Sequence, residues 1–171
     1  MAGLYFHIPF CKRICGYCDF FRVADLKLMG SVVEAMHTEM EEQRDFLSDR
    51  SIKTIYFGGG TPSLLHPGEV QHFIDHANEI WNCQAVEEIT IEANPDDITE
   101  EYVAALRDTV VNRVSLGIQS FDDAELKFMN RRHSAAVAVA AVKRLQDAGI
   151  GNITIDLIFG VDGFDEQVLS R

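Results

Sequence analysis

The chain has 171 residues, of which 47% are hydrophobic, and this is enough for one domain with a real core. Its formal net charge of −12, from 15 Lys and Arg against 27 Asp and Glu, would repel a phosphate backbone, so we expect no nucleic-acid binding. The sequence shows no apolar run of membrane-spanning length and no signal-peptide pattern. With four cysteines, these features predict a reducing, cytoplasmic compartment in which the thiols serve a metal or redox role.

Strand and helix patterns alternate along the chain. Short apolar runs rich in β-branched residues predict strands at Leu4–Ile8, Thr54–Phe57, Glu88–Glu92, Val114–Ile118 and Ile153–Phe159. Between the first three strands, helical spacing gives one apolar face with Val33, Met36, Met40 and Leu47, and a second with Val70, Phe73, Ile74, Ala77 and Trp81. A third helix is expected to begin at the N-cap Thr99, and a fourth to run from about Ser134 to Ala148 with Gly149 as its C-cap.

This alternation predicts an α/β fold with a parallel sheet, either open and doubly wound or closed towards a barrel. The near-continuous hydrophobicity of the runs is typical of strands covered on both faces. After the last strand, Asp165–Leu169 predicts the first turn of a helix, and the sequence ends at Arg171. We therefore expect the chain to be an N-terminal fragment of a longer architecture.

Three cysteines form a tight cluster, C-x3-C-x2-C, at Cys11, Cys15 and Cys18. Four-iron clusters normally take four cysteine ligands, so three thiolates without an obvious fourth favour a cluster with one open iron. The alternative is a structural zinc site with His7 as the fourth ligand. The remaining cysteine, Cys83, has no partner at a ligand spacing and is expected to be a simple buried or half-buried thiol.

Polar residues follow several of the predicted strands. In parallel α/β folds ligands lie at the carboxyl ends of strands. There the sequence places Gly58–Gly60, which let the backbone approach a ligand, and the hydrogen-bonding side chains of Glu92, Gln119 and Asp156. Arg131 can pair with a carboxylate. Taken singly, the two acids would more often be strand-end caps or salt-bridge partners, and the arginine a solvated helix-end charge.

These pieces together carry a family resemblance. The segments that match are Tyr5–Phe20, Phe57–Leu64, Glu92–Pro95, Asn112–Phe121, Arg131–His133 and Asp156–Gly160. The chain resembles the radical S-adenosylmethionine (SAM) superfamily, in the branch that holds oxygen-independent coproporphyrinogen III oxidases and the related haem chaperones. The resemblance runs from Tyr5 to about Gly163.

The resemblance implies a fold, a set of cofactors and a set of site residues. The fold would be a partial, TIM-like (β/α)6 barrel truncated after about five strands, with residues 1–171 forming a radical SAM core that lacks its sixth strand and a C-terminal domain. Cys11, Cys15 and Cys18 would hold a [4Fe-4S] cluster that donates one electron to S-adenosylmethionine. The positions that match S-adenosylmethionine contacts in the family are Tyr5, Tyr17, Gly59, Gly60, Thr61, Glu92, Gln119, Arg131 and Asp156.

Two departures from the family pattern bear on function. The oxidases carry a further cysteine two positions after the third, where this chain has Phe20, as the haem chaperones do. Val161–Gly163 stands where the family usually has leucine-proline-glycine, which should change only a loop. The resemblance thus implies a haem chaperone that binds haem, receives an electron from a donor protein and delivers haem to acceptor proteins. The alternatives are a coproporphyrinogen III oxidase, acting on a porphyrinogen, and a related radical methyltransferase.

The histidines outside these motifs receive no role. His37, His66, His72 and His76 are expected on helical or loop faces without ligand spacing to one another, in surface or internally satisfied positions. His133 lies within a family-like block and is assigned no function.

Overall fold

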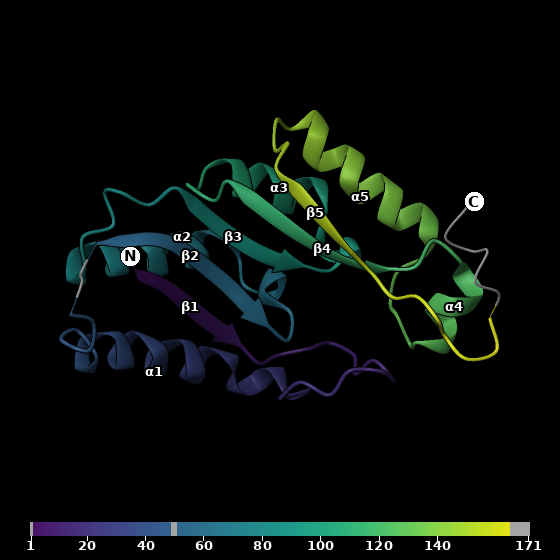
Figure 1. Ribbon diagram of the computed structural model, residues 1–171, viewed down its shortest axis with the longest axis horizontal. Helices are drawn as coiled ribbons and strands as arrows, with labels where there is room; N and C mark the ends of the chain where they lie inside the picture. Colours follow the sequence, from purple (N-terminus) through teal and green to yellow (C-terminus); the bar gives the residue numbers. More distant parts are fainter. Residues whose placement is uncertain (1, 49–50, 165–171) are drawn as a thin grey trace.

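A computed structural model describes residues 2–48 and 51–164 of the chain (Figure 1). Within these residues, five parallel strands form one sheet in the order β1-β2-β3-β4-β5. The strands are β1 (Ala2–Ile8), β2 (Ile52–Gly59), β3 (Glu88–Ala93), β4 (Arg113–Gln119) and β5 (Ile153–Leu157). Sequential parallel order with helical crossovers is the arrangement of a barrel that is not closed.

Most of the helices that connect the strands cover one face of the curved sheet (Figure 1), and neighbouring helices on that face pack against each other. They are α1 (Met29–Glu42), α2 (Pro67–Ile80), α3 (Glu100–Arg107), α4 (Asp123–Phe128) and α5 (Ala135–Asp147), with short 3-10 turns at Leu26–Leu28, Pro62–Leu64 and Pro95–Asp97. In the described part of the chain, none of these helices has the length and apolarity to cross a membrane.

The two faces of the sheet differ in chemistry because successive strand residues point to opposite sides. The helix-covered face carries the core side chains Phe6, Ile55, Phe57, Ile91 and Leu116. The registered positions on the other face carry Tyr5, Tyr56, Glu92, Ser115 and Asp156. The apolar side chains therefore hold the helices to the sheet, and the opposite face is left for polar groups.

The predicted α/β, partial-barrel fold is confirmed, with different boundaries. The first two strands begin earlier than expected, at Ala2 and Ile52, and the last ends at Leu157 rather than at Phe159. The expectation that every strand is covered on both faces is wrong for the edge strands, because Tyr5 of β1 is 58% exposed. An edge strand has a neighbouring strand on one side only, whereas a central strand has one on each side. The hydrophobicity of a strand does not tell whether it lies at the edge or in the centre of the sheet.

Two helix predictions also need correction. Leu47 lies beyond the end of α1 at Glu42, although it still packs against the core. The short helix α4 was not predicted; Asp122 begins it by accepting hydrogen bonds from the backbone amides of Ala124 and Glu125. The predicted helix start at Asp165–Leu169 lies outside the described residues.

Candidate cofactor site

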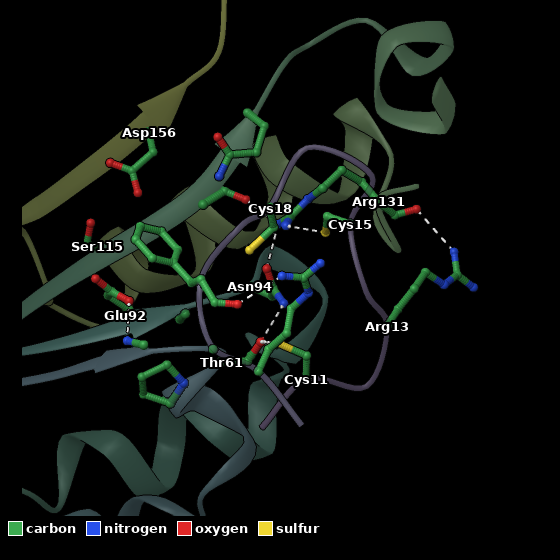
Figure 2. A pocket seen from close by; sticks show the side chains of 18 of the residues that line it. Cys11, Arg13, Cys15, Cys18, Thr61, Glu92, Asn94, Ser115, Arg131 and Asp156 are labelled. Atoms are coloured by element: carbon green, nitrogen blue, oxygen red, sulfur yellow. Dashed lines mark hydrogen bonds between the residues drawn. The ribbon is translucent and has the colours of Figure 1, made fainter. Parts of the chain in front are cut away.

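A cavity of about 180 Å³ opens at the carboxyl ends of the strands (Figure 2). Its walls come from the loop after β1, the glycines that end β2, the ends of β3, β4 and β5, and the segment between α4 and α5. The predicted site residues that line it are Cys11, Cys15, Tyr17, Cys18, Gly59, Gly60, Thr61, Glu92, Gln119, Arg131 and Asp156. The fold thus brings together side chains up to 145 positions apart in sequence (from 11 to 156).

Tyr5 is the predicted residue that the structure places outside this cavity lining. Its ring stacks on Tyr56 at a centroid distance of 5.9 Å, and its hydroxyl lies 3.2 Å from Nδ1 of His7. Tyr5 therefore lies on the polar face of the sheet, outside the residues that line the cavity.

The cysteine sulfurs meet polar donors at the cavity wall. The Thr61 hydroxyl donates to Sγ of Cys11 at 3.6 Å, and Nη1 of Arg131 donates to Sγ of Cys15 at 3.4 Å. Burial raises the pKa of the Cys11 thiol, and the neighbouring thiols add to the effect while Thr61 opposes it. Hydrogen-bond donors in these positions would stabilise the thiolate form of each cysteine.

Gly60 allows the loop to come this close. A Cβ on Gly60 would lie 2.7 Å from the carbonyl oxygen of Phe10 and 3.0 Å from Sγ of Cys11. Neighbouring Gly59 has a φ of +116°, a conformation that favours glycine. The glycine run is therefore required by backbone shape next to the cysteines, beyond the demands of a simple turn.

The alternative of a zinc site completed by His7 finds no support in this geometry. The His7 ring packs under Gly59, where an added Cβ would lie 2.8 Å from its Cε1 and Nδ1 atoms. His7 is also absent from the described cavity wall, and its Nδ1 is engaged with the Tyr5 hydroxyl.

Arg131 is the hub of the cavity's hydrogen bonds. Its Nη2 donates to Oδ1 of Asn94 and to the carbonyl of Gly117, both at 2.5 Å, and Nη1 donates to the Tyr17 hydroxyl at 3.2 Å. Burial, together with Cys15, raises the pKa of Tyr17 to about 12, so this hydroxyl stays protonated at neutral pH. Arg131 thus connects the cysteine loop, the turn after β3 and strand β4, which a solvated helix-end charge would not do.

Glu92 and Gln119 are fixed by the backbone around them. Glu92 accepts from the Gly59 amide at 3.1 Å and from the Tyr56 hydroxyl at 2.7 Å. Gln119 has a φ of +71°, rare for a residue with a side chain, at a register shift between β4 and β5. Strain of this kind often accompanies functional positions. Asp156 faces the same open side from β5 (Figure 2).

The cysteine loop is tied to the rest of the site by an ion network that the sequence did not reveal. Asp97 is buried and accepts from Nζ of Lys12 at 2.9 Å, from the Ser63 hydroxyl at 2.9 Å and from Nη2 of Arg132 at 2.9 Å. Lys12 follows Cys11 directly, so this carboxylate anchors the first cysteine to the end of β3. Asp97 follows a second acid in a polar turn, and nothing in that pattern marks it as buried.

A second set of ties holds the middle of the loop. The Gly16 amide donates to the carbonyl of Met129 at 3.1 Å, and Nδ2 of Asn130 donates to the carbonyl of Ile14 at 2.7 Å. Asn94 is a further residue to which the sequence assigned no role, although it directly follows β3 and accepts a hydrogen bond from Arg131. Its position two residues past Glu92, at a strand end, was the available signal.

Three cysteines around one cavity, lined by hydrogen-bond donors and closely approached by glycine backbone, fit an iron–sulfur cluster with one open iron. The fourth cysteine, Cys83, is half-buried elsewhere, as predicted, and burial raises the pKa of its thiol. His133 is buried, with Nε2 3.0 Å from the carbonyl oxygen of Ile118.

One prediction about histidines is wrong. His37, His72 and His76 were expected without ligand spacing to one another, but their rings lie together between α1 and α2, with centroids 4.6 Å and 5.0 Å from that of His37. His72 and His76 are one helical turn apart, and the packing of α1 on α2 adds His37 to them.

Comparison with known proteins gives a family and several relatives. A family profile described as "Radical SAM superfamily" matches residues 5–169. The "Heme chaperone HemW" of Lactococcus lactis is 41% identical over 93% of this chain and 41% of its own length, and that of Escherichia coli is 35% identical over 93% and 43%. In the mouse, "Radical S-adenosyl methionine domain-containing protein 1, mitochondrial" is 34% identical over 94% and 36%. The chain spans about two fifths of the length of the curated relatives it matches.

Solved structures give the same picture of the fold. The coproporphyrinogen III oxidase HemN of Escherichia coli, described as a radical SAM enzyme, superposes with a TM-score of 0.88 at 25% identity, over 98% of this chain and 39% of that one. An archaeal Elp3 from Methanocaldococcus infernus superposes with a TM-score of 0.61 at 17% identity, a likeness of fold alone.

Proposed function

The chain belongs to the radical SAM superfamily, and from that premise we propose that its cavity binds a [4Fe-4S] cluster and S-adenosylmethionine in a protein that carries haem as a chaperone. The observation that carries the proposal is the meeting of Cys11, Cys15 and Cys18 with the strand-end polar residues around one cavity. When bound, the cluster and S-adenosylmethionine would supply one-electron chemistry, with the electron coming from a donor protein.

The residues of the chain would bind and orient these groups. The three thiolates would hold the cluster, and the Thr61 hydroxyl and Arg131 guanidinium would stabilise the negative charge on their sulfurs. Glu92 and Asp156 offer carboxylate oxygens to the hydroxyls or the ammonium group of S-adenosylmethionine.

The remaining proposed contacts shape the space around that ligand. Gly59 and Gly60 give it close access to backbone, and Gln119 can both donate and accept. Tyr17 presents its hydroxyl beside Arg131. Tyr5 lies outside the cavity lining, so its proposed contact requires the ligand to extend over the polar face of the sheet.

Support for haem handling comes from Phe20 and from the relatives. Phe20 lines the cavity and is 71% exposed, at the position where the oxidases carry a further cysteine. An exposed aromatic ring at the mouth of a cavity suits a flat apolar ligand better than a metal. Haem, and proteins that accept it, are therefore the proposed partners, in keeping with relatives called haem chaperones.

A second candidate is the oxidation of a porphyrinogen, favoured by the superposition on HemN. That reading shares the cluster and S-adenosylmethionine site. The oxidase would receive a porphyrinogen in the outer part of the cavity, where the chaperone would receive haem. Phe20 argues against the oxidase, because the oxidases carry a cysteine at this position.

Anaerobic reconstitution with iron and sulfide tests the cofactor. About four irons per chain are expected, together with a change in the spectrum of the reduced cluster on addition of S-adenosylmethionine. Cys15→Ala should lose the iron, whereas Cys83→Ala should keep it as the matched control, because Cys83 lies outside the cavity. Stoichiometric zinc with no response to S-adenosylmethionine would overturn the proposal.

A second measurement separates chaperone from oxidase. A full-length version of the protein, reconstituted in the same way, is titrated with haem and, in a parallel sample, incubated with coproporphyrinogen III, S-adenosylmethionine and a reductant. Stoichiometric haem binding without decarboxylation supports the chaperone. Formation of protoporphyrinogen IX assigns the oxidase activity instead.

A further inference from the structure

A second cluster of ligand-type side chains lies between α1 and α2, apart from the residues that line the cofactor cavity. Helix α1 contributes His37 and Glu41, and helix α2 contributes Glu69, His72 and His76. The His37 ring stacks flat on Phe73 at a centroid distance of 4.2 Å, which fixes its plane. The proposed function assigns no role to these five side chains.

The hydrogen bonds of the cluster indicate which ring nitrogens of His37 and His76 carry a proton. A carboxylate only accepts, so Nε2 of His76 donates to Oε1 of Glu41, 2.9 Å away. In a neutral His76 ring Nδ1 then carries the lone pair, and Nδ1 of His37, 2.8 Å away, donates to it. This leaves Nε2 of His37 with a lone pair and no proton.

That lone pair is buried, and among the described residues Nε2 of His37 has no hydrogen-bond partner. It lies 3.8 Å from Oε1 of Glu69, and Nδ1 of His72 lies 3.5 Å from the same oxygen. A cation placed between these atoms would satisfy both the lone pair of His37 and the carboxylate of Glu69.

We propose that Nε2 of His37, Nδ1 of His72 and the carboxylate of Glu69 form a binding site for one divalent transition-metal ion, with Zn²⁺ as the best match. The three ligand atoms lie within 4.8 Å of one another. Zinc bonds of about 2.0–2.2 Å place tetrahedral ligands roughly 3.3 Å apart, so small side-chain rotations close the site. Two imidazoles and one carboxylate leave the fourth position for water.

The surrounding groups support a metal in this place. His76, held in turn by Glu41, accepts from the second ring nitrogen of His37 and so orients the ring, as a hydrogen bond at that nitrogen commonly does for metal-binding histidines. Asp75 and Glu79 line the same groove and add negative charge. The bound ion would join α1 to α2, the helices that cover the β1–β2 side of the sheet.

The test uses Zn²⁺ alone, with a chromophoric chelator in competition, on the protein with its cysteine cavity loaded with iron and sulfide. One Zn²⁺ per chain is expected to bind beyond the reconstituted iron. His72→Ala and Glu69→Gln should each weaken that binding by roughly 10- to 100-fold or more. Both side chains are partly exposed, so neither change should prevent folding, which circular dichroism checks.

Two further variants keep the outcomes distinct. His66→Asn alters an exposed histidine that caps α2 outside the cluster, and Zn²⁺ affinity should stay at the wild-type value. In Cys11→Ala/Cys15→Ala/Cys18→Ala, which cannot hold the iron cluster, Zn²⁺ should still bind and should still be lost on adding His72→Ala. Unchanged affinity in both His72→Ala and Glu69→Gln, or no Zn²⁺ bound by the wild type, would overturn the proposal whether or not the cofactor assignment holds.

Discussion

At the scale of single residues, the shape of the cavity depends on a glycine that leaves no room for a side chain and on an arginine that makes several hydrogen bonds. Gly60 lies against the carbonyl of Phe10 and the sulfur of Cys11, and Arg131 bridges Asn94 and Gly117. Neither residue could be replaced without moving a wall of the cavity. Their contributions can be measured separately from any bound cofactor.

Gly60→Ala should destabilise the protein by about 1–3 kcal/mol, as overpacking commonly does. The added Cβ would meet the Phe10 carbonyl oxygen at 2.7 Å and the Pro9 carbonyl carbon at 2.8 Å, and backbone atoms cannot rotate away. The measurement is the free energy of unfolding in urea. Gly16→Ala, in the same loop but with nothing within 4 Å of its Cβ, should change stability by less than about 0.5 kcal/mol. Equal losses in the two variants would refute the steric argument.

Arg131→Ala should cost about 1–3 kcal/mol of unfolding free energy, because the Asn94 side chain and the Gly117 carbonyl lose their donor. Arg131→Lys should recover part of the loss, since an ammonium group cannot reproduce the guanidinium fork. Denaturant melts of both variants give the values. Arg13→Ala is the control: it removes an exposed hydrogen bond to the Arg131 carbonyl and should cost little. If Arg13→Ala is as harmful as Arg131→Ala, the hub role is wrong.

At the scale of elements, the loop after β1 has no regular structure over most of Cys11–Cys18, and its shape comes from what it is tied to. Asp97 binds its first part to the turn after β3, while Met129 and Asn130 bind its middle to the end of α4. Loop positions are held by these distant partners, since the loop itself contributes little secondary structure. The position of the cysteines is therefore a property of the assembled sheet edge.

Asp97→Asn should destabilise the protein by about 2 kcal/mol, because Lys12 and Arg132 lose a buried charged acceptor. The loss is moderated by Asp96, which also pairs with Arg132 at 3.0 Å, and by the half-exposed Lys12. Chemical denaturation measures it. Asp147→Asn breaks the exposed Lys143 pair in α5 and should cost only about 0.3–0.5 kcal/mol. A similar small cost for Asp97→Asn would mean that the network does not anchor the loop.

Element-scale patterns explain which parts were predictable from sequence. The strand-end positions of Glu92, Gln119 and Asp156 followed from one rule, that parallel strands present their carboxyl ends at one edge. The helix α4 was missed because its six residues are too few to show a clear period. The histidine cluster was missed because His37 joins the α2 residues only through the packing of α1 on α2, although His72 and His76 are already one helical turn apart.

At the scale of the whole molecule, the sheet sorts its side chains into an apolar face under helices and a polar face that leads to the cavity. The alternation that produces this sorting is in the sequence, but strand order and edge exposure are not. Buried polar groups such as Asp97 and His133 depend on neighbours from several elements and could not be assigned beforehand. One of them makes global stability depend on pH.

The stability of the folded chain should fall as pH drops below about 6.5, in part through His133. Burial and the nearby Arg131 lower the pKa of His133, so the folded state holds fewer protons at this position than the unfolded state does. Its contribution is complete above the unfolded pKa of about 6.5 and is lost as pH falls through the lower folded value. His133→Asn, whose amide can still donate to the Ile118 carbonyl, should flatten the slope of unfolding free energy against pH in this window. His66→Asn, at an exposed position, should leave the slope as in the wild type, and a slope unchanged in His133→Asn as well would remove His133 from the explanation.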